Sequence, residues 1–423
     1  MNYKLCMRMK KIILKNFKHE SRTIEQLDVF VHDDDSLILI PSFYSFFLFY
    51  HLRHYKQIDK KLKNGINQTQ LVQSDISVVT ASQYISQLDR FLRYLHQSDQ
   101  ENPGQNWLTL NHNLPPEIIN HYINDVFIVQ GKHSSTSATQ CVAALTSYYN
   151  YLSKVGLTYY KSLSITPGNK TTAQKNTKRR EAIKYLPQST RNALYRQCTS
   201  MRNKVILKCG AELGTRAKEV AGLYLNDFEY GQETRKGLLT LFNEMDSNPD
   251  ETVFTYFLPG KNSKGKPGKG GMSRNLYIEV ALLQEMQEYY QEERPANSDC
   301  NTFFLKVDQN TYGEPIEERH ASNVFRDAKD MLLQVQEQDN SFTYKIHKDH
   351  VFHVMRHSFG TDKFYEYAKD TGNRIDAITA NSAVMIQIAE LLGHSLGGLD
   401  KGLKVTRSYI RSARDKMTME ELI

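Results

Sequence analysis

Cysteine is scarce in this sequence, with five residues in 423. The five are odd in number and widely spaced, and none forms a CxxC pair, so the sequence indicates neither a disulfide framework nor a zinc site. A reducing cytosol is the compartment that this pattern predicts. The cysteines are Cys6, Cys141, Cys198, Cys209 and Cys300.

Two other classes of motif are missing. The sequence contains no Walker phosphate-binding sequence and no cluster of carboxylates at metal-ligand spacing. His347, His350 and His353 recur every third residue, but no carboxylate or cysteine joins them at ligand spacing. We therefore expect neither a nucleotide cofactor nor a metal ion.

Long apolar runs are also missing. The uncharged run from Ser36 to Leu52 is shorter than the roughly 20 residues that cross a bilayer, and it contains Pro41. We interpret it as a buried aromatic segment and expect no contact with a membrane. The N-terminus has basic residues but neither an apolar stretch nor a small-residue cleavage site, so we expect no secretory signal.

The balance of charge is moderately basic. There are 54 lysines and arginines against 47 aspartates and glutamates, which gives a formal net charge of +7. This excess suits a polyanionic partner without requiring one. The length and the 40% content of hydrophobic residues predict a globular protein with more than one domain.

The first half of the chain predicts a small helical domain. We assign no chemistry to residues 1–73, whose pattern is mixed and partly strand-like. Apolar residues recur at helical spacing from Thr80 to Leu95, and again after Ser134 up to Gly156. These two amphipathic helices define a helical domain over residues 74–166.

A basic segment over residues 167–180, PGNKTTAQKNTKRR, follows the helical domain. It has no apolar periodicity and many polar residues, which is typical of an exposed linker. Its charged residues include Lys178, Arg179 and Arg180. They either keep a simple tether exposed to solvent or contact the phosphates of DNA.

Residues 181–423 predict a second domain that is mainly helical and contains a small antiparallel β-sheet. The predicted helices cover 185–225 in three pieces broken at Gly214, and then 278–292, 321–336, 353–369 and 383–392. The predicted strands cover 237–242, 252–258 and 275–278. No fixed-period repeat is present, which excludes solenoids and propellers.

Four separated segments of this second domain together contain most of the residues that we expect to be catalytic. They are ELGTRAKEVAGL (212–223), HVMRHSFGT (353–361), ELLGHS (390–395) and VTRSYI (405–410). Each alone is weak, because Arg216 with Glu219 three positions on is an ordinary helical ion pair, and Tyr409 is one of 25 tyrosines. Their ordered combination argues against coincidence.

In this order the segments resemble the motif boxes of the tyrosine recombinase, or phage integrase, family. The resemblance covers residues 181–423, and residues 74–160 resemble the family's helical core-binding domain. It implies two domains that form a clamp around double-stranded DNA, and a tetramer assembled on two DNA sites. It also implies strand cleavage by a tyrosine that becomes joined to a 3′ phosphate, with no cofactor.

The chemistry explains the residue types in these boxes. Attack on a phosphodiester adds charge to its non-bridging oxygens, and Arg216 and Arg356 are the always-charged donors we assign to them. Tyr409 supplies the attacking oxygen. Because a phenol has a pKa of about 10, a base assists it, and His353 is our candidate.

The resemblance extends to the supporting groups. Leaving oxygens need a proton, which in the family comes from a hairpin lysine. Lys261 fits by position, while Lys264 or Lys269 can displace it or can contact DNA phosphates instead. His394 matches the family's histidine or tryptophan that hydrogen-bonds the scissile phosphate. The remaining predicted supporting residues are Glu219, as an orienting partner, and His357.

One departure from the family concerns the nucleophile. His394 and Tyr409 lie fifteen positions apart, more than the family usually shows. We retain Tyr409 because Thr406 to Tyr409 resembles the final box, and Tyr365 or Tyr367 would replace it only under a different threading. The apolar tail after Ile410 either docks in a neighbouring subunit or packs on its own domain.

The function that follows is site-specific recombination by the integrase of a mobile element in the bacterial cytosol, associated with the nucleoid. Accessory DNA-bending or directionality proteins are possible partners. The alternatives are a type IB topoisomerase, which uses similar chemistry without synapsis, and a recombinase-derived DNA-binding protein that has lost catalysis. An unrelated helical binding module requires every box to arise by chance.

Overall fold

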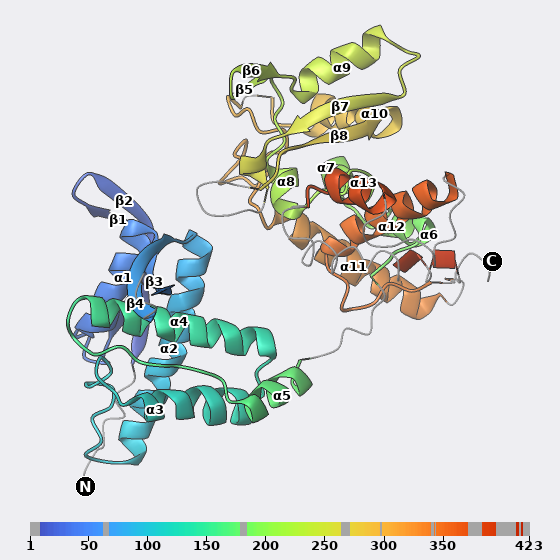
Figure 1. Cartoon of the computed structure of the whole chain (residues 1–423). Helices are drawn as coiled ribbons and strands as arrows, with labels where there is room; N and C mark the ends of the chain where they lie inside the picture. Colours follow the sequence, from blue (N-terminus) through green and yellow to red (C-terminus); the bar gives the residue numbers. More distant parts are fainter. Residues whose placement is uncertain are drawn as a thin grey trace. The chain divides into compact units, whose positions relative to one another are not determined.

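The structure is a computed structural model. It describes residues 9–61, 67–177, 184–263, 271–296, 298–339, 342, 344–370, 383–394, 412–413 and 416–417. The chain forms two compact units, Met1–Arg179 and Arg180–Ile423, which are considered one at a time (Figure 1). The fold is mainly helical with small two-stranded antiparallel sheets, as predicted. No helix among the described residues is long and apolar enough to cross a membrane.

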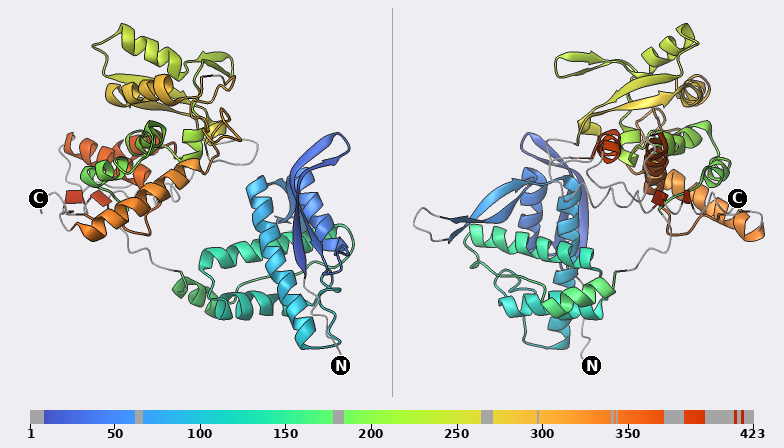
Figure 2. Two further views of the ribbon diagram at one scale, coloured as in Figure 1. Left: turned by 180° about the vertical axis from the view of Figure 1, so that it is seen from behind. Right: turned by 45° about the vertical axis from the view of Figure 1, so that its right-hand side comes forward.

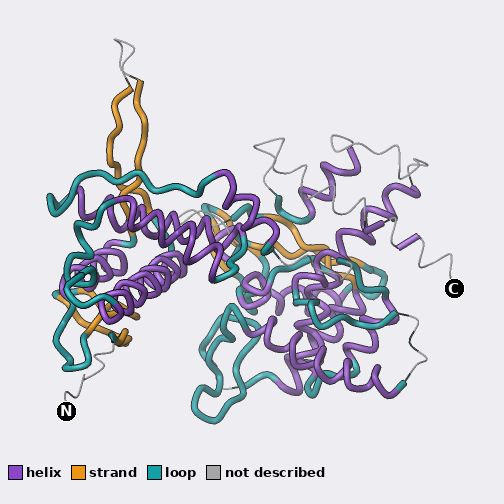
Figure 3. Tube along the Cα trace, turned by 90° about the horizontal axis from the view of Figure 1, so that it is seen from below, coloured by secondary structure: helices purple, strands orange, loops and turns teal. Residues whose placement is uncertain are grey.

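Two antiparallel hairpins form the β-structure of the first unit. The first pairs β1 (Lys10–His19) with β2 (Arg22–Val31), and the second pairs β3 (Arg53–Lys61) with β4 (Asn67–Asp75). The β3–β4 hairpin projects from the helices of its unit (Figure 3). The partly strand-like pattern of this region predicted β-structure but not its arrangement in hairpins.

The helices of the first unit are α1 (Leu39–His51), α2 (Val78–Glu101), α3 (Pro116–His121), the π-helix η1 (Tyr122–Gln130), α4 (Ser135–Lys154) and α5 (Pro167–Lys175). α2 and α4 confirm the two predicted amphipathic helices. Each begins at a serine cap: the Ser77 hydroxyl accepts from the Thr80 amide and the Ser134 hydroxyl from the Ser137 amide.

The aromatic run of residues 36–52 contributes helix α1 to the core of the first unit. The Tyr44 and Leu48 side chains are fully buried there, alongside residues of α2 and α4. The Tyr44 hydroxyl donates to Ser147 Oγ at 2.8 Å and ties α1 to α4. Residues before position 74 therefore share one core with the predicted helical domain.

Residues 167–175 of the predicted exposed linker form helix α5, which the sequence analysis did not predict. Thr166 caps this helix by accepting from the Asn169 amide, and Pro167 occupies its first turn, where a missing amide proton has no cost. Ala173 is buried against the core. Capping signals, rather than apolar periodicity, make this short segment helical. Lys178, Arg179 and Arg180 lie outside the described residues.

The second unit contains α6 (Gln188–Tyr195), α7 (Met201–Glu212), α8 (Ala217–Ala221), β5 (Phe228–Tyr230), β6 (Glu233–Arg235), α9 (Leu238–Ser247), β7 (Val253–Leu258), the 3-10 turn η2 (Gly260–Asn262), β8 (Arg274–Glu279), α10 (Val280–Glu288), the π-helix η3 (Tyr289–Glu293), α11 (His320–Gln338), α12 (His353–Asp370) and α13 (Ala383–Leu391). Figure 2 shows this unit from two further directions. The helices confirm the predicted three-piece segment broken at Gly214 and the later helical segments.

The predicted strand over 237–242 is wrong, because helix α9 begins at Leu238. Leu238, Leu241, Phe242 and Met245 are buried and recur at helical spacing, so a helix places them all on the core side. The other two predicted strands are confirmed as β7 and β8. They pair antiparallel from Val253 with Glu279 to Leu258 with Arg274, which places Arg274 at the loop end of this hairpin.

We expect the core of the first unit to depend on Phe91, which is fully buried in α2. Replacing Phe91 with alanine should lower the free energy of unfolding of this unit by about 3–5 kcal/mol, through lost burial and a cavity. Phe43→Ala is the matched control, because Phe43 is 59% exposed, and its effect should stay within about 0.5 kcal/mol. Amide hydrogen exchange of α2 and α4 measures both, and equal effects would contradict the described packing.

Candidate active site

The site is built around the carboxylate of Glu219 on α8. Arg216 immediately precedes this helix, and its backbone amide donates to Glu219 Oε2 at 2.9 Å, as in half of a capping box. The same turn of sequence therefore starts the helix and fixes both side chains. The Glu219 side chain has no exposed surface, so its charge needs partners within the protein.

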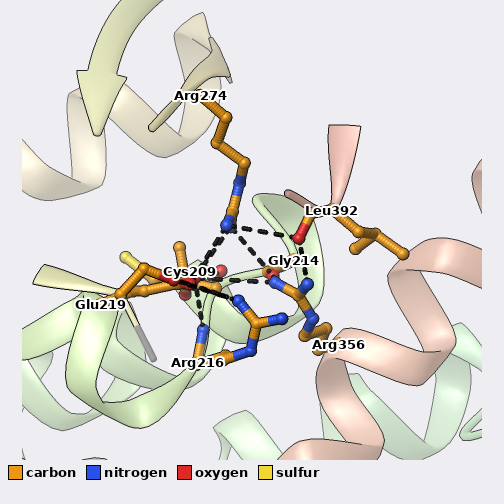
Figure 4. A network of polar contacts seen from close by, with 9 residues as sticks. Cys209, Gly214, Arg216, Glu219, Arg274, Arg356 and Leu392 are labelled. Atoms are coloured by element: carbon orange, nitrogen blue, oxygen red, sulfur yellow. Dashed lines mark hydrogen bonds and ion pairs between the residues drawn. The ribbon is translucent and has the colours of Figure 1, made fainter. Parts of the chain in front are cut away.

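Arginines from separate segments supply most of these partners (Figure 4). Arg216 Nη1 donates to Glu219 Oε1 at 2.6 Å. Arg274, from the start of β8, donates through Nη1 to Oε1 at 3.1 Å and through Nη2 to Oε2 at 2.9 Å. Arg356 of α12 lies 3.6 Å from Oε2. The Ser263 hydroxyl completes the set by donating to Oε1 at 2.5 Å.

These charges keep the carboxylate ionised. Burial by itself raises the pKa of Glu219, but the charge and hydrogen bonds of Arg274, with the charges of Arg356 and Arg216, hold it well below its usual range. One carboxylate thus faces three guanidinium groups, which leaves the cluster with surplus positive charge. Such a surplus beside a partly open surface is suited to bind an anion.

Two helix ends hold the arginines from the other side. Arg356 donates through Nη1 to the Gly214 carbonyl, after α7, and through Nη2 to the Leu392 carbonyl, after α13. Arg274 donates to the same two carbonyls, to Gly214 at 3.3 Å and to Leu392 at 3.5 Å. Carbonyls at helix C-termini carry partial negative charge, so cations there are favourable.

Gly214 is required at the end of α7. Its φ is +61°, in the left-handed region that L side chains rarely adopt. A Cβ at this position would lie 2.5 Å from a ring carbon of Phe359. The Gly-Thr-Arg sequence therefore combines a helix stop, a carbonyl for Arg356 and the start of α8.

The two arginines predicted from the sequence, Arg216 and Arg356, differ in exposure. The Arg216 side chain is 23% exposed, while that of Arg356 is 1% exposed. Arg216 is therefore the one of the two whose side chain reaches the surface. Arg356 is buried and donates to the carbonyls that follow α7 and α13.

The predicted histidines come from two elements. His353 is exposed and His357 buried on α12, with ring centroids 4.7 Å apart in an edge-to-face arrangement. Burial, and then the charges of His353, Lys184 and Arg356, lower the pKa of His357 to about 3. Burial, and then the charges of Arg356, Arg216 and Arg274, lower the pKa of His394 to about 3. Both imidazoles are neutral near pH 7.

A pocket of about 210 Å³ opens beside these histidines. His353 and His357 line it, together with Lys184, Asp349 and His350. The neutral imidazole of His357 can donate a ring N–H to an anionic group bound in this pocket. In the parts of the chain that the structure describes, no group of three or more histidines, cysteines and acidic residues could hold a metal ion.

Lys261 lies in the turn after β7, with its Nζ 5.3 Å from the centre of the Tyr224 ring. Ser263, two residues on, contacts the cluster through Glu219 and Arg216. Lys264 and Lys269 lie outside the described residues.

Tyr409 also lies outside the described residues, so its predicted role stays a prediction. Two short pieces of the tail beyond it are described. Ala413 is buried with Phe359 and Phe364, and Lys416 donates to Asp362 at 2.8 Å. Both contacts lie on α12 of the same chain. The two alternatives for the apolar points of the tail stay predictions, because Met417 is 36% exposed and residues 418–423 lie outside the described residues.

Sequence reasoning missed Arg274 and Ser263. A signal for Arg274 was present, because Arg274, Leu276 and Ile278 alternate in phase and all three are buried in β8. A charged residue on the buried face of a strand needs a partner of opposite charge, which indicates an internal ion pair. Ser263 carries no comparable signal.

No family model matches the chain, and no curated protein sequence matches it significantly. Solved structures do match. The XerH site-specific recombinase bound to a palindromic substrate is 14% identical with a TM-score of 0.47, over 82% of this chain and 80% of that chain. The integrase of transposon Tn1549, in complex with a circular intermediate DNA, is 14% identical with a TM-score of 0.40, over 80% and 98%. XerA recombinase is 17% identical with a TM-score of 0.33, over 81% and 93%.

We expect Gly214→Ala to destabilise the second unit in two ways. The positive φ costs about 1 kcal/mol for a residue with a Cβ, and the clash with Phe359 adds roughly 2 kcal/mol. Gly231→Ala separates these effects, because Gly231 has a φ of +69° and a Cβ added there would meet no atom within 4 Å. Unfolding in urea, monitored by hydrogen exchange of the α7 amides, compares the two variants. Equal losses in the free energy of unfolding would contradict the close approach of α7 and α12.

A pH prediction follows from the histidines. Unfolded histidines take up protons as the pH falls below 6.5, whereas His357 and His394 in the fold stay neutral to about pH 3. The free energy of unfolding should therefore decrease as the pH is lowered from 6.5 to about 5, above the range where most carboxylates titrate. His357→Gln should make this decrease shallower in urea unfolding curves measured across that range. An unchanged slope would show that His357 is not held neutral by its surroundings.

Proposed function

We propose that this chain is a tyrosine-type site-specific DNA recombinase that cuts and rejoins DNA through a covalent bond between Tyr409 and a backbone phosphate. The observation that carries the proposal is the cluster of Arg216, Arg274 and Arg356 around the buried carboxylate of Glu219. It joins separate motif boxes into a single cationic site. The order of those boxes along the chain supports the same conclusion.

The chemistry of cleavage fits this cluster. The Tyr409 oxygen forms a bond to phosphorus while the bond to the 5′ oxygen breaks, which leaves a 3′-phosphotyrosyl link and a free 5′ hydroxyl. Arg216, with its open face, stabilises the charge that develops on the non-bridging oxygens. His353 takes the phenol proton, His394 hydrogen-bonds the phosphate, and a hairpin lysine, Lys261 in the first instance, protonates the leaving oxygen.

Religation reverses these steps when a 5′ hydroxyl attacks the phosphotyrosyl bond. The energy of the broken phosphodiester is kept in the covalent link, so the exchange needs no nucleotide cofactor. The basic character of the chain suits a DNA partner. We further propose that the two units clamp a duplex, that the segment around Lys178 to Arg180 contacts its phosphates, and that four copies act on two sites.

The biological setting we propose is the integration or excision of a mobile element, with accessory DNA-bending or directionality proteins as additional partners. The base sequence recognised depends on a few side chains in the grooves and on DNA shape.

The nucleophile is tested with a suicide substrate. The full-length protein is incubated with nicked duplexes tiled across the DNA that flanks its own coding sequence, without metal or ATP. Wild type should form a protein–DNA adduct that resists denaturant, and Tyr409→Phe should form none because it lacks the attacking oxygen. Tyr367→Phe is the matched control and should react like wild type.

The other outcomes each point elsewhere. An adduct that survives in Tyr409→Phe but not in Tyr367→Phe would move the nucleophile to Tyr367. Binding of DNA without any adduct would favour a recombinase-derived protein that has lost catalysis. Relaxation of supercoils without strand exchange between two duplexes would favour a type IB topoisomerase.

A further inference from the structure

Arg274 is a buried partner of Glu219 that bonds both oxygens of its carboxylate. Its side chain is 4% exposed, and its two terminal nitrogens each donate to a different carboxylate oxygen, at 3.1 and 2.9 Å. This bidentate geometry is the strongest arrangement available to an arginine and a carboxylate. Arg216, by contrast, reaches Glu219 through Nη1 alone.

We propose that Arg274 is a positioning residue that neutralises Glu219 and so keeps the guanidinium of Arg216 available to the substrate phosphate. This inference rests on the proposed recombinase function and adds to it a residue that belongs to none of the motif boxes.

The contacts of Arg216 carry the first step of the argument. Its Nη1 is shared between Glu219 Oε1 at 2.6 Å and Ser263 Oγ at 3.2 Å. Within the described part of the chain, no residue accepts a hydrogen bond from Arg216 Nε or Nη2. The partly exposed side chain of Arg216 thus keeps donors for a phosphate, while Arg274 occupies both oxygens of the carboxylate.

Removal of Arg274 would change this division. Glu219 would remain buried without the partner that bonds both of its oxygens, and a buried charge that loses a partner is strongly destabilising. The group best placed to compensate is Arg216, which the turn that starts α8 holds beside the carboxylate and which can form a closer, two-point contact with it. The N–H groups of Arg216 that then bind Glu219 are no longer available to bind the phosphate.

Arg274 also joins the segments that carry the other predicted groups. It extends from β8, the strand paired with the one that leads to Lys261, and bonds the Gly214 and Leu392 carbonyls next to Arg216 and His394. Gly393 permits this approach, because its φ is +61° and a Cβ there would lie 3.1 Å from Arg274 Nη1. Arg274 therefore fixes the hairpin relative to both helix ends.

A positioning role differs from a merely structural ion pair in its dependence on the charge of the substrate. A structural defect slows cleavage of every substrate alike. A defect in presenting Arg216 slows cleavage of an anionic phosphodiester much more than cleavage of a methylphosphonate, whose scissile group is neutral and gains less from an arginine. Nicked duplexes that differ only at the scissile phosphate supply this comparison.

The experiment measures the rate of adduct formation by the full-length protein on both duplexes. Arg274→Gln should slow the phosphodiester reaction about 100-fold but the methylphosphonate reaction only about threefold. Combining it with Glu219→Gln should recover most of the loss, because no buried charge then competes for Arg216. Arg326→Gln, at an exposed position of α11, is the matched control and should react like wild type on both duplexes.

The outcomes separate this inference from the proposed function. Equal losses on the two duplexes, or no recovery in the double variant, would overturn the role of Arg274 and leave the recombinase proposal in place. A wild-type protein that forms no adduct with either duplex would overturn both.

Thermal unfolding shows whether Arg274→Gln is folded. If it is not, Arg274→Lys decides the question, because lysine keeps the charge but lacks the two-point fork. It should show a smaller loss with the same dependence on substrate charge, and a loss that ignores substrate charge would overturn the inference.

Discussion

Burial of the Glu219 carboxylate is the constraint on which the architecture of the second unit depends. An ionised carboxylate with no exposed surface is costly to desolvate and is tolerated only when charges and hydrogen bonds surround it. Its partners come from the start of α8, the β7–β8 hairpin and α12. Segments far apart in the sequence are therefore held in one arrangement by one charge. Arg356 and Arg274 extend that arrangement to the ends of α7 and α13, because both also bind the Gly214 and Leu392 carbonyls.

Much of this fold could be predicted from periodicity. α2 and α4 follow their apolar spacing and serine caps, and the break at Gly214 was visible as a glycine between two helical patterns. The errors have physical causes. The short run that begins at Leu238 contains leucines and a phenylalanine, which suit a strand or a helix, and only the placement of Met245 on the same face decides for the helix. The segment from Pro167 lacks apolar periodicity because only Ala173 of its helix is buried, so its caps were the only available signal.

The candidate site was predicted in part. The order of the motifs predicted that Arg216, Glu219 and Arg356 lie in one site, and in the structure these residues do lie together. Order along the chain says nothing, however, of which arginine is covered and which is open. Exposure depends on how α12 packs beside the end of α7, a tertiary property that buries Arg356 and leaves Arg216 partly exposed.

The charge of the cluster fits the proposed reaction better than it fits the substrate at rest. Three arginines and one glutamate give the cluster two more positive than negative charges. A phosphodiester carries one negative charge, and attack by an ionised phenol oxygen brings a second onto the five-coordinate phosphorus. The cluster is thus balanced in the transition state and not in the ground state, which is the condition for charge to lower a barrier instead of only tightening binding. Without Arg274 the same cluster would match the ground state, so a residue that does not touch the phosphate sets the charge that the phosphate meets.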